Sequence, residues 1–374
     1  MAFASNRLIA ARRSGGPGGA ATAVLEAESG WRIELPGAPG PLAARGPRLL
    51  ATAQRTDDEL SALWIDADTG EITARLALRA TEFVIAVDVA ACDGAAAIAG
   101  AFAGTLRVGD REVSSGGLRD GFVATLDAAG QVASLVRLGG AGDDGLTAVG
   151  CRGDAVAIAG TFGPGAELRG ATLPRVAERS GASDAVVALL RAGGVVWQRS
   201  FGGAAEDLPL DLTFTDAGEL AVVGVARGEL ALGGVTHQVA GPADGYLARW
   251  SLEGELIGSL RLGGPDYDAA TRVAALGDTL FVTGFFSGTV DLDGVVLRAQ
   301  GGDDAMLVIV TPGSPTRAAP ISGAGREEVV SLVPAGRALA LGVAHTAGLS
   351  ALGLAAPPPA DPLGGAAALL VPSW

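Results

Sequence analysis

Residues Asp120–Gly140 read DGFVATLDAAGQVASLVRLGG. Two later stretches repeat this pattern, with DAVVALLRAGGVVWQRSFGG at Asp184–Gly203 and DGYLARWSLEGELIGSLRLGG at Asp244–Gly264. The three stretches begin about sixty residues apart. Self-similarity at a fixed period is the signature of architectures in which one small supersecondary unit is stacked several times. The repeat, rather than a series of unrelated domains, therefore organises the 374 residues of the chain.

Each repeat reads as a set of short strands. In residues 140–202 we expect strands at 146–151 and 155–162, a third beginning at Asp184, and a fourth at 195–201. Short apolar segments between turn residues indicate an all-β fold. The second and third strands are nearly continuous apolar runs, whereas the fourth alternates, so the inner strands should be covered on both faces. Such sheets, stacked about an axis, form a β-propeller; a linear β-solenoid is the alternative.

The count of repeats predicts an all-β, six-bladed β-propeller with four antiparallel strands per blade, built as a single domain of residues 1–374. The predicted blades are approximately residues 20–79, 80–139, 140–202, 203–263, 264–322, and 323–374 plus 1–19. The last repeat stops one strand short, and Asn6–Gly16 (NRLIAARRSGG) resembles a fourth strand. We therefore expect this N-terminal strand to pair beside Ala366–Pro372 and to close the last blade, which would remove the open sheet edges.

Three short motifs recur along the chain. They are D-[AG]-Φ-x-A-x-Φ (Φ apolar) at Asp120, Asp184 and Asp244, Φ-G-G at Leu138, Phe201 and Leu262, and G-x-F-x-G at Gly100–Gly104 and Gly284–Gly288. They resemble the bacterial "seven-bladed β-propeller" repeats found in large surface proteins of GC-rich bacteria such as myxobacteria. The resemblance covers nearly the whole chain and implies a propeller fold. It implies no shared catalytic residues, and this chain departs from the family name because six repeats are counted.

An acidic residue opens each repeat after the first. This series is Glu82, Asp144, Asp207, Asp268 and Glu327, at spacings of 62, 63, 61 and 59 residues. In a closed ring these carboxylates would converge at one mouth of the central channel, where they could bind calcium or a cationic ligand. In the structural alternative, each carboxylate accepts N–H groups in its own Gly-rich turn. A second series, Asp58, Asp120, Asp184, Asp244 and Asp304, is expected to fix the turn before each third strand.

Composition narrows the range of partners. The net charge of −14 and the pI of about 4.6 disfavour nucleic acid and anionic membrane surfaces. No apolar run is long enough to span a bilayer. The N-terminus lacks a signal-peptide core, which predicts a cytoplasmic protein, or an exported one if a leader has been trimmed. The two cysteines, Cys92 and Cys151, are expected to be small buried thiols, with a bridge between them as the alternative.

No catalytic signature is recognisable in the sequence. The two histidines have no zinc-binding spacing, and neither a nucleophile elbow nor a phosphate-binding loop occurs. We therefore predict no cofactor other than calcium, and no enzyme activity. The expected function is a non-catalytic binding or scaffolding propeller for a protein partner. The alternatives are a surface or secreted module that binds glycan or calcium, and a hydrolase or lyase with an acidic site at the channel mouth.

Overall fold

The computed structural model describes residues 2–4, 7–14, 22–27, 30–176, 183–292, 294–336, 338–346, 349–351, 354–356 and 365–372. Within these ranges the chain is all-β, and the strands of every sheet pair antiparallel. No helix in the described ranges is long and apolar enough to cross a membrane. The chain divides into two compact units, Met1–Pro174 with Val186–Gln198 and Arg175–Ala185 with Arg199–Trp374. Each unit is described by itself below.

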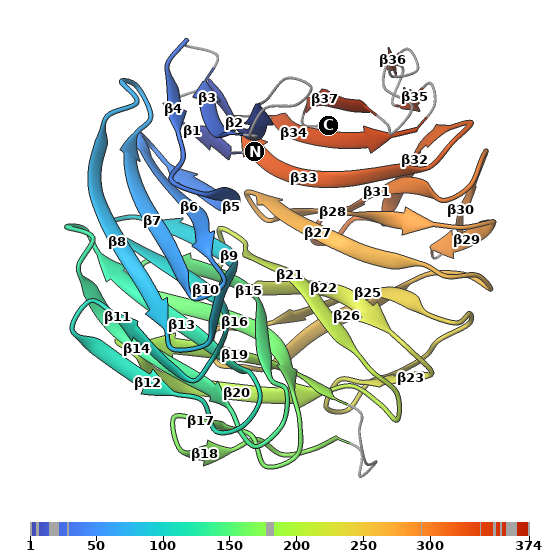
Figure 1. Ribbon diagram of the computed structural model, residues 1–374. Coiled ribbons are helices and arrows are strands. Elements are labelled where there is room, and N and C mark those ends of the chain that lie inside the picture. Colours follow the sequence, from blue (N-terminus) through green and yellow to red (C-terminus); the bar gives the residue numbers. More distant parts are fainter. Residues whose placement is uncertain are drawn as a thin grey trace. The chain divides into compact units, whose positions relative to one another are not determined.

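The first unit carries four sheets (Figure 1). The first is β1 (Ala2–Ala4), β2 (Arg7–Ser14), β3 (Thr22–Ala27) and β4 (Arg32–Glu34). The second is β5 (Ala38–Arg45), β6 (Arg48–Thr56), β7 (Glu59–Asp66) and β8 (Ile72–Ala80), extended by β11 (Thr105–Val108) and β12 (Arg111–Ser114). The third is β9 (Phe83–Cys92), β10 (Ala95–Ala103), β13 (Asp120–Asp127) and β14 (Val132–Gly139), extended by β17 (Glu167–Leu168) and β18 (Ala171–Thr172). The fourth is β15 (Gly145–Arg152), β16 (Ala155–Phe162), β19 (Asp184–Arg191) and β20 (Gly194–Phe201), most of whose residues belong to this unit.

The second unit carries three more sheets. One is β21 (Leu208–Phe214), β22 (Leu220–Ala226), β25 (Asp244–Trp250) and β26 (Leu256–Leu262), with the separate hairpin β23 (Glu229–Ala231) and β24 (Thr236–Gln238). The next is β27 (Ala269–Leu276), β28 (Thr279–Phe286), β31 (Asp304–Val310) and β32 (Arg317–Gly323), extended by β35 (Leu349–Ala351) and β36 (Leu354–Ala356), with the hairpin β29 (Thr289–Leu292) and β30 (Val295–Arg298). The last is β33 (Glu327–Ala335), β34 (Ala338–His345) and β37 (Gly365–Pro372).

The predicted contrast between inner and outer strands is confirmed. Every residue of β22 is buried, as is every residue of β19 except its last. The outer strand β20 instead alternates between buried and accessible positions. Inner strands are covered on both faces because successive sheets within a unit stack face to face, so that Ile158 of β16 shares an apolar cluster with Val123 of β13. An apolar run in the sequence therefore indicates an inner strand of a sheet, and an alternating run indicates an outer strand.

The connections between second and third strands form hairpins. The β11–β12 hairpin joins the outer strand β8 of the preceding sheet, and the β17–β18 hairpin joins β14 in the same way. In the second unit, β35 pairs with the outer strand β32. An outer strand would otherwise present a row of unpaired backbone groups, so these hairpins protect the sheet edge.

Two predictions about the N-terminal region are wrong. The strand predicted within Asn6–Gly16 does not complete the last sheet, because β2 pairs with β1 and β3, its neighbours in the sequence. Residues 20–79 also do not form one blade, since β5 to β8 begin a new sheet at Ala38. The reason is that this sheet lacks the usual hairpin: only residues 57 and 58 separate β6 from β7. A count of sixty residues back from Glu82 therefore runs into the preceding sheet, and the described strands form seven sheets of three or more strands rather than six.

The expectation of free thiols is also corrected. Cys92 of β9 and Cys151 of β15 form a disulfide, with their Cα atoms 5.8 Å apart. The two strands begin neighbouring sheets that stack within the first unit. The bridge closes a chain segment of 59 residues and holds two consecutive sheets together.

Replacing both cysteines, in a Cys92→Ala/Cys151→Ala variant, should lower the free energy of unfolding by about 4 kcal/mol. The loss follows from the loop entropy that a bridge of this length removes from the unfolded chain. Urea denaturation of oxidised wild type, reduced wild type and the variant measures it. Reduced wild type should match the variant, and equal stability of oxidised and reduced wild type would contradict the prediction.

Candidate functional site

The predicted acidic series divides into buried and exposed members. Asp144 lies in the first unit and is 2% exposed, whereas Asp207, Asp268 and Glu327 lie in the second unit and are fully buried. Glu82 is exposed. The four buried carboxyls each stand at or just before the first strand of a sheet, where the chain returns from an outer strand. Burial of an ionisable group requires hydrogen bonds or neutralisation, so the partners of each carboxyl decide what it can do.

Asp144 accepts hydrogen bonds from the Gly-rich turns around it. Its Oδ2 accepts the N–H of Gly140 at 2.8 Å, and its Oδ1 accepts the N–H of Gly163 at 2.6 Å. Gly140 follows the outer strand β14, and Gly163 follows β16. One carboxylate therefore ties the end of one sheet to two strands of the next.

The same pattern recurs in the second unit. Asp207 accepts the N–H of Gly203 at 2.7 Å and that of Arg227 at 3.1 Å. Asp268 accepts the N–H of Gly264 at 2.6 Å and that of Ser287 at 3.0 Å. These are the hydrogen bonds that the structural alternative for the series predicts. Channel-mouth binding by Glu82, Asp144, Asp207, Asp268 and Glu327 stays a prediction. Among the described residues, no group of three or more His, Cys, Asp or Glu is placed to hold a metal ion.

The second aspartate series uses the same turn. Asp120, Asp244 and Asp304 are buried, and each accepts the N–H of the residue four positions earlier, at 2.8–2.9 Å. Asp58 differs because it is exposed and accepts the Thr56 hydroxyl at 2.6 Å. Asp184 is also buried, but it accepts the N–H of Val176, eight positions earlier, at 2.9 Å. Asp120, Asp244 and Asp304 therefore fix the turn before the third strand, as the sequence predicted, whereas Asp58 and Asp184 do not make this bond.

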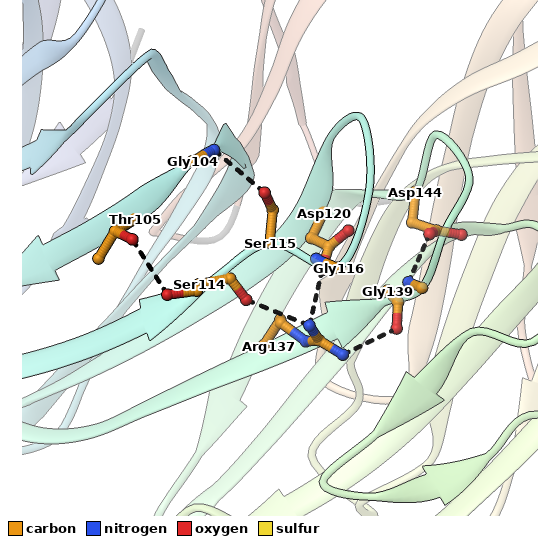
Figure 2. Close-up of polar contacts among 10 residues, drawn as sticks. Gly104, Thr105, Ser114, Ser115, Gly116, Asp120, Arg137, Gly139 and Asp144 are labelled. Atoms are coloured by element: carbon orange, nitrogen blue, oxygen red, sulfur yellow. Dashed lines mark hydrogen bonds and ion pairs between the residues drawn. The ribbon is translucent and has the colours of Figure 1, made fainter.

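The buried carboxyls come in pairs, and three pairs have an arginine. Asp120 and Asp144 interact with each other, and the Arg137 guanidinium lies 3.3 Å from Asp120. Figure 2 shows Arg137 between Asp120 and the carbonyl groups of Ser114 and Gly139, which it contacts at 3.1 and 3.3 Å. In the second unit, the other two pairs are Asp244 with Asp268, where Arg261 is 2.7 Å from Asp244, and Asp184 with Asp207, where Arg175 is 2.7 Å from Asp184.

The fourth pair, Asp304 with Glu327, has no such arginine among the described ion pairs. Asp304 Oδ2 accepts the Gln300 N–H at 2.8 Å. In the described structure, both Glu327 oxygens and Asp304 Oδ1 are buried and form no hydrogen bond of regular geometry, and the Gly323 N–H is the backbone group that still lowers the pKa of Glu327. A buried carboxylate without a donor is costly, so the arrangement that satisfies both groups is one proton shared between the two carboxyls.

The pKa of the Glu327 carboxyl differs from those of the other buried carboxyls. Burial, followed by the nearby Asp304 carboxyl, raises the pKa of Glu327 to about 7. Burial raises the pKa of Asp207 and of Asp268 to about 6, against the lowering effect of the backbone N–H groups that they accept. The pKa of Asp144 is raised by burial as well. At neutral pH, Glu327 is therefore the carboxyl that most readily exchanges a proton.

Two aspartates that the sequence analysis overlooked link successive sheets. Asp88 of β9 accepts the N–H of Val149 of β15 at 2.8 Å, in the first unit. Asp211 of β21 accepts the N–H of Val273 of β27 at 2.9 Å, in the second. A signal was present, because each aspartate interrupts the apolar pattern of a first strand, as Val-Asp-Val and Leu-Asp-Leu. The role of each aspartate could not be inferred from this signal, because it depends on which strand of the next sheet packs beside the aspartate.

Known protein families, curated proteins and solved structures give different results when compared with this chain. No protein-family model matches the chain, and no curated protein matches it. Among solved structures it is similar to the crystal structure of a puromycin hydrolase, with 14% identity over 92% of this chain and a TM-score of 0.40. The chain spans 58% of the length of that structure. The sequence analysis predicted a non-catalytic scaffold; this is corrected, because the similar structure belongs to an enzyme.

The raised carboxyl pKa values predict the pH dependence of stability. Unfolded Asp and Glu titrate near pH 4, while folded Asp207, Asp268 and Glu327 titrate at about 6, 6 and 7. The native state therefore binds more protons than the unfolded state between these values, and the free energy of unfolding should fall as pH rises through this window.

Urea midpoints measured at intervals between about pH 5 and pH 8 test this expectation. Glu327→Gln cannot ionise and should remove the fall that continues up to about pH 7, above the pH of about 6 where the Asp207 and Asp268 contributions end. The exposed-site control Glu82→Gln should keep the wild-type profile. A wild-type midpoint that rises with pH, or an unaltered profile in Glu327→Gln, would show that the carboxyls do not carry the effect.

Proposed function

We propose that this chain is a hydrolase whose acid–base centre is the Asp304–Glu327 pair. The observation that carries the proposal is the pairing of two buried carboxyls that have no arginine among the described ion pairs, whereas three matching pairs have one. A pair that shares one proton holds a base and an acid side by side at neutral pH. In hydrolysis, the carboxylate would accept a proton from the attacking water, and the carboxylic acid would protonate the leaving group.

The register of the sheets explains why this pair differs. Arg137 pairs with Phe122, one residue before the Gly121–Leu138 pair in β14. The equivalent residue in β32 is Pro320, which pairs with Met306. Proline has no charge and cannot replace the guanidinium, so the proton remains as the group that compensates the two carboxyls.

Glycine turns lie next to the pair in the sequence. Gly301 and Gly302 are exposed, directly before the buried Asp304. The Gly302 N–H donates to the Gly325 carbonyl at 3.0 Å, and the Glu327 N–H donates to the Asp303 carbonyl at 3.0 Å. The pair thus lies one turn beneath the surface, under backbone that glycine leaves free to rearrange.

An aromatic surface beside these turns favours a substrate with a planar group. The rings of Tyr267 and Phe285 stack with centroids 5.9 Å apart and planes at 3°, and the Arg326 guanidinium lies 5.8 Å from the Phe285 centroid. Tyr267 is 39% exposed, and Arg326 directly precedes Glu327. Such groups can hold an aromatic leaving group by stacking.

We also propose that the seven sheets close into a β-propeller. Support comes from the sixty-residue repeat, from the face-to-face stacking of successive sheets within each unit, and from the number seven in the name of the repeat family that the middle repeats resemble. In small-angle X-ray scattering, a closed ring of this length should give a radius of gyration of about 21 Å. A clearly larger value would indicate an open array of sheets.

The hydrolase proposal predicts turnover that depends on both carboxyls. Wild type should release nitrophenol or nitroaniline from at least one member of a panel of p-nitrophenyl esters, p-nitrophenyl glycosides and aminoacyl p-nitroanilides. Glu327→Gln and Asp304→Asn should each lower kcat by about 100-fold or more, because each removes the proton exchange. Glu82→Gln is the control and should keep wild-type kcat.

The pH profile separates catalysis from folding. Wild-type activity should depend on a group titrating near pH 7, and circular dichroism should show that both carboxyl variants keep the fold. No turnover of any panel member by wild type would overturn the proposal. Wild-type kcat in a folded Glu327→Gln variant would do the same.

A further inference from the structure

The first unit contains a cavity that shares Arg137 with the Asp120–Asp144 pair. Its volume is about 190 Å³, and it lies where the β17–β18 hairpin extends β14. Its walls are formed by Val113, Leu135, Val136, Arg137, Glu167 and Arg169. The lining residues therefore include three with apolar side chains, two arginines and one glutamate. At about 30 Å³ per water molecule, 190 Å³ corresponds to about six waters, so the cavity can take only a small ligand.

Arg137 is held in a fixed orientation at this cavity. Its guanidinium contacts the Ser114 carbonyl, the Gly139 carbonyl and the Asp120 carboxylate at 3.1–3.3 Å, and its side chain is 28% exposed (Figure 2). These contacts leave part of its five N–H donors for a ligand. A guanidinium that is already ordered loses little conformational entropy when it binds a carboxylate.

Arg169 adopts a backbone conformation that its side chain disfavours. It occupies the two-residue turn of the β17–β18 hairpin with φ of +54°, followed by Gly170 with φ of +79°. This turn prefers Asn, Asp or Gly at its first position, and a side chain such as arginine is strained there. In the described part of the chain, Arg169 makes no hydrogen bond or ion pair that would offset this cost. A strained backbone conformation that no contact of its side chain compensates indicates a functional role.

We propose that this cavity binds a free apolar α-amino acid. The ligand carboxylate would lie between Arg137 and Arg169, because guanidinium groups bind carboxylates with paired N–H donors. The ligand ammonium would face Glu167, and its side chain would pack against Leu135 and Val113. The three charges of the cavity and its apolar lining residues match the charges and the apolar side chain of such a zwitterion.

Calorimetric titration of the whole chain with L-leucine tests the proposal. Wild type should bind leucine, whereas Arg169→Asn should bind it at least about tenfold more weakly, while its Tm stays the same or rises because Asn suits the turn. Ala192→Asn is the matched control. Ala192 also has a positive φ, +47°, and precedes a turn glycine, but it lies outside the cavity walls. Its Tm should respond in the same direction while leucine affinity stays at the wild-type value.

Two leucine analogues test the two charged ends of the ligand separately. 4-Methylpentanoate lacks the ammonium, and 3-methylbutylamine lacks the carboxylate. Both should bind wild type more weakly than leucine, and Glu167→Gln should weaken leucine but leave 4-methylpentanoate unchanged. The proposal is overturned if wild type shows no leucine binding up to about 10 mM, if Arg169→Asn keeps full affinity, or if 4-methylpentanoate binds wild type as tightly as leucine.

Discussion

A buried carboxylate that accepts the N–H of the residue four positions earlier is the interaction on which this structure depends. It occurs before third strands, as at Asp120, and before first strands, as at Asp144. Each turn would otherwise bury an unpaired N–H as the chain passes from one sheet to the next. The first glycine of the Φ-G-G motif is required for the same reason, since a Cβ atom at Gly139 would overlap the Asp120 carboxyl. The Φ-G-G motif and the carboxylate turn therefore arise from the same contact between glycine and aspartate.

The fold of the middle repeats was predictable from the sequence because strand, turn and carboxylate recur there at a constant spacing. Strand β16 has the predicted bounds, Ala155–Phe162, and β20 differs by one residue. The N-terminal region was misread because the period itself changes there: β6 passes to β7 without a hairpin, and a constant period then assigns residues to the wrong sheet. Pairing of β2 with β3, its neighbour in the chain, also closes a far shorter loop than pairing with the C-terminal strand would.

The candidate site was predictable only in part. The positions of the acidic residues follow from the repeat, but their charge states depend on neighbours that the repeat does not fix. Asp184 receives its arginine from the preceding loop, at Arg175, whereas Asp120 receives Arg137 from the adjacent outer strand. Asp304 and Glu327 receive none from the part of the chain that the structure describes. One aspartate position in the repeat can therefore be a salt-bridged anchor or a member of a proton-sharing pair, and the cross-strand register and the preceding loop together distinguish the two.

Departures from the repeat carry the functional information in a chain of this kind. Residues that recur in every repeat are mostly those that form the turns and the hydrogen bonds of the backbone. A residue that departs from the repeat and destabilises the local structure therefore needs a separate explanation. Pro320 replaces an arginine and leaves two buried carboxyls to share a proton. Arg169 occupies a turn position suited to asparagine and directs a charge to a cavity. The two departures lie in different units, on an outer strand and on an edge hairpin, which are the parts of each sheet least constrained by core packing. Core strands can therefore keep the repeat while the sheet margins change their chemistry.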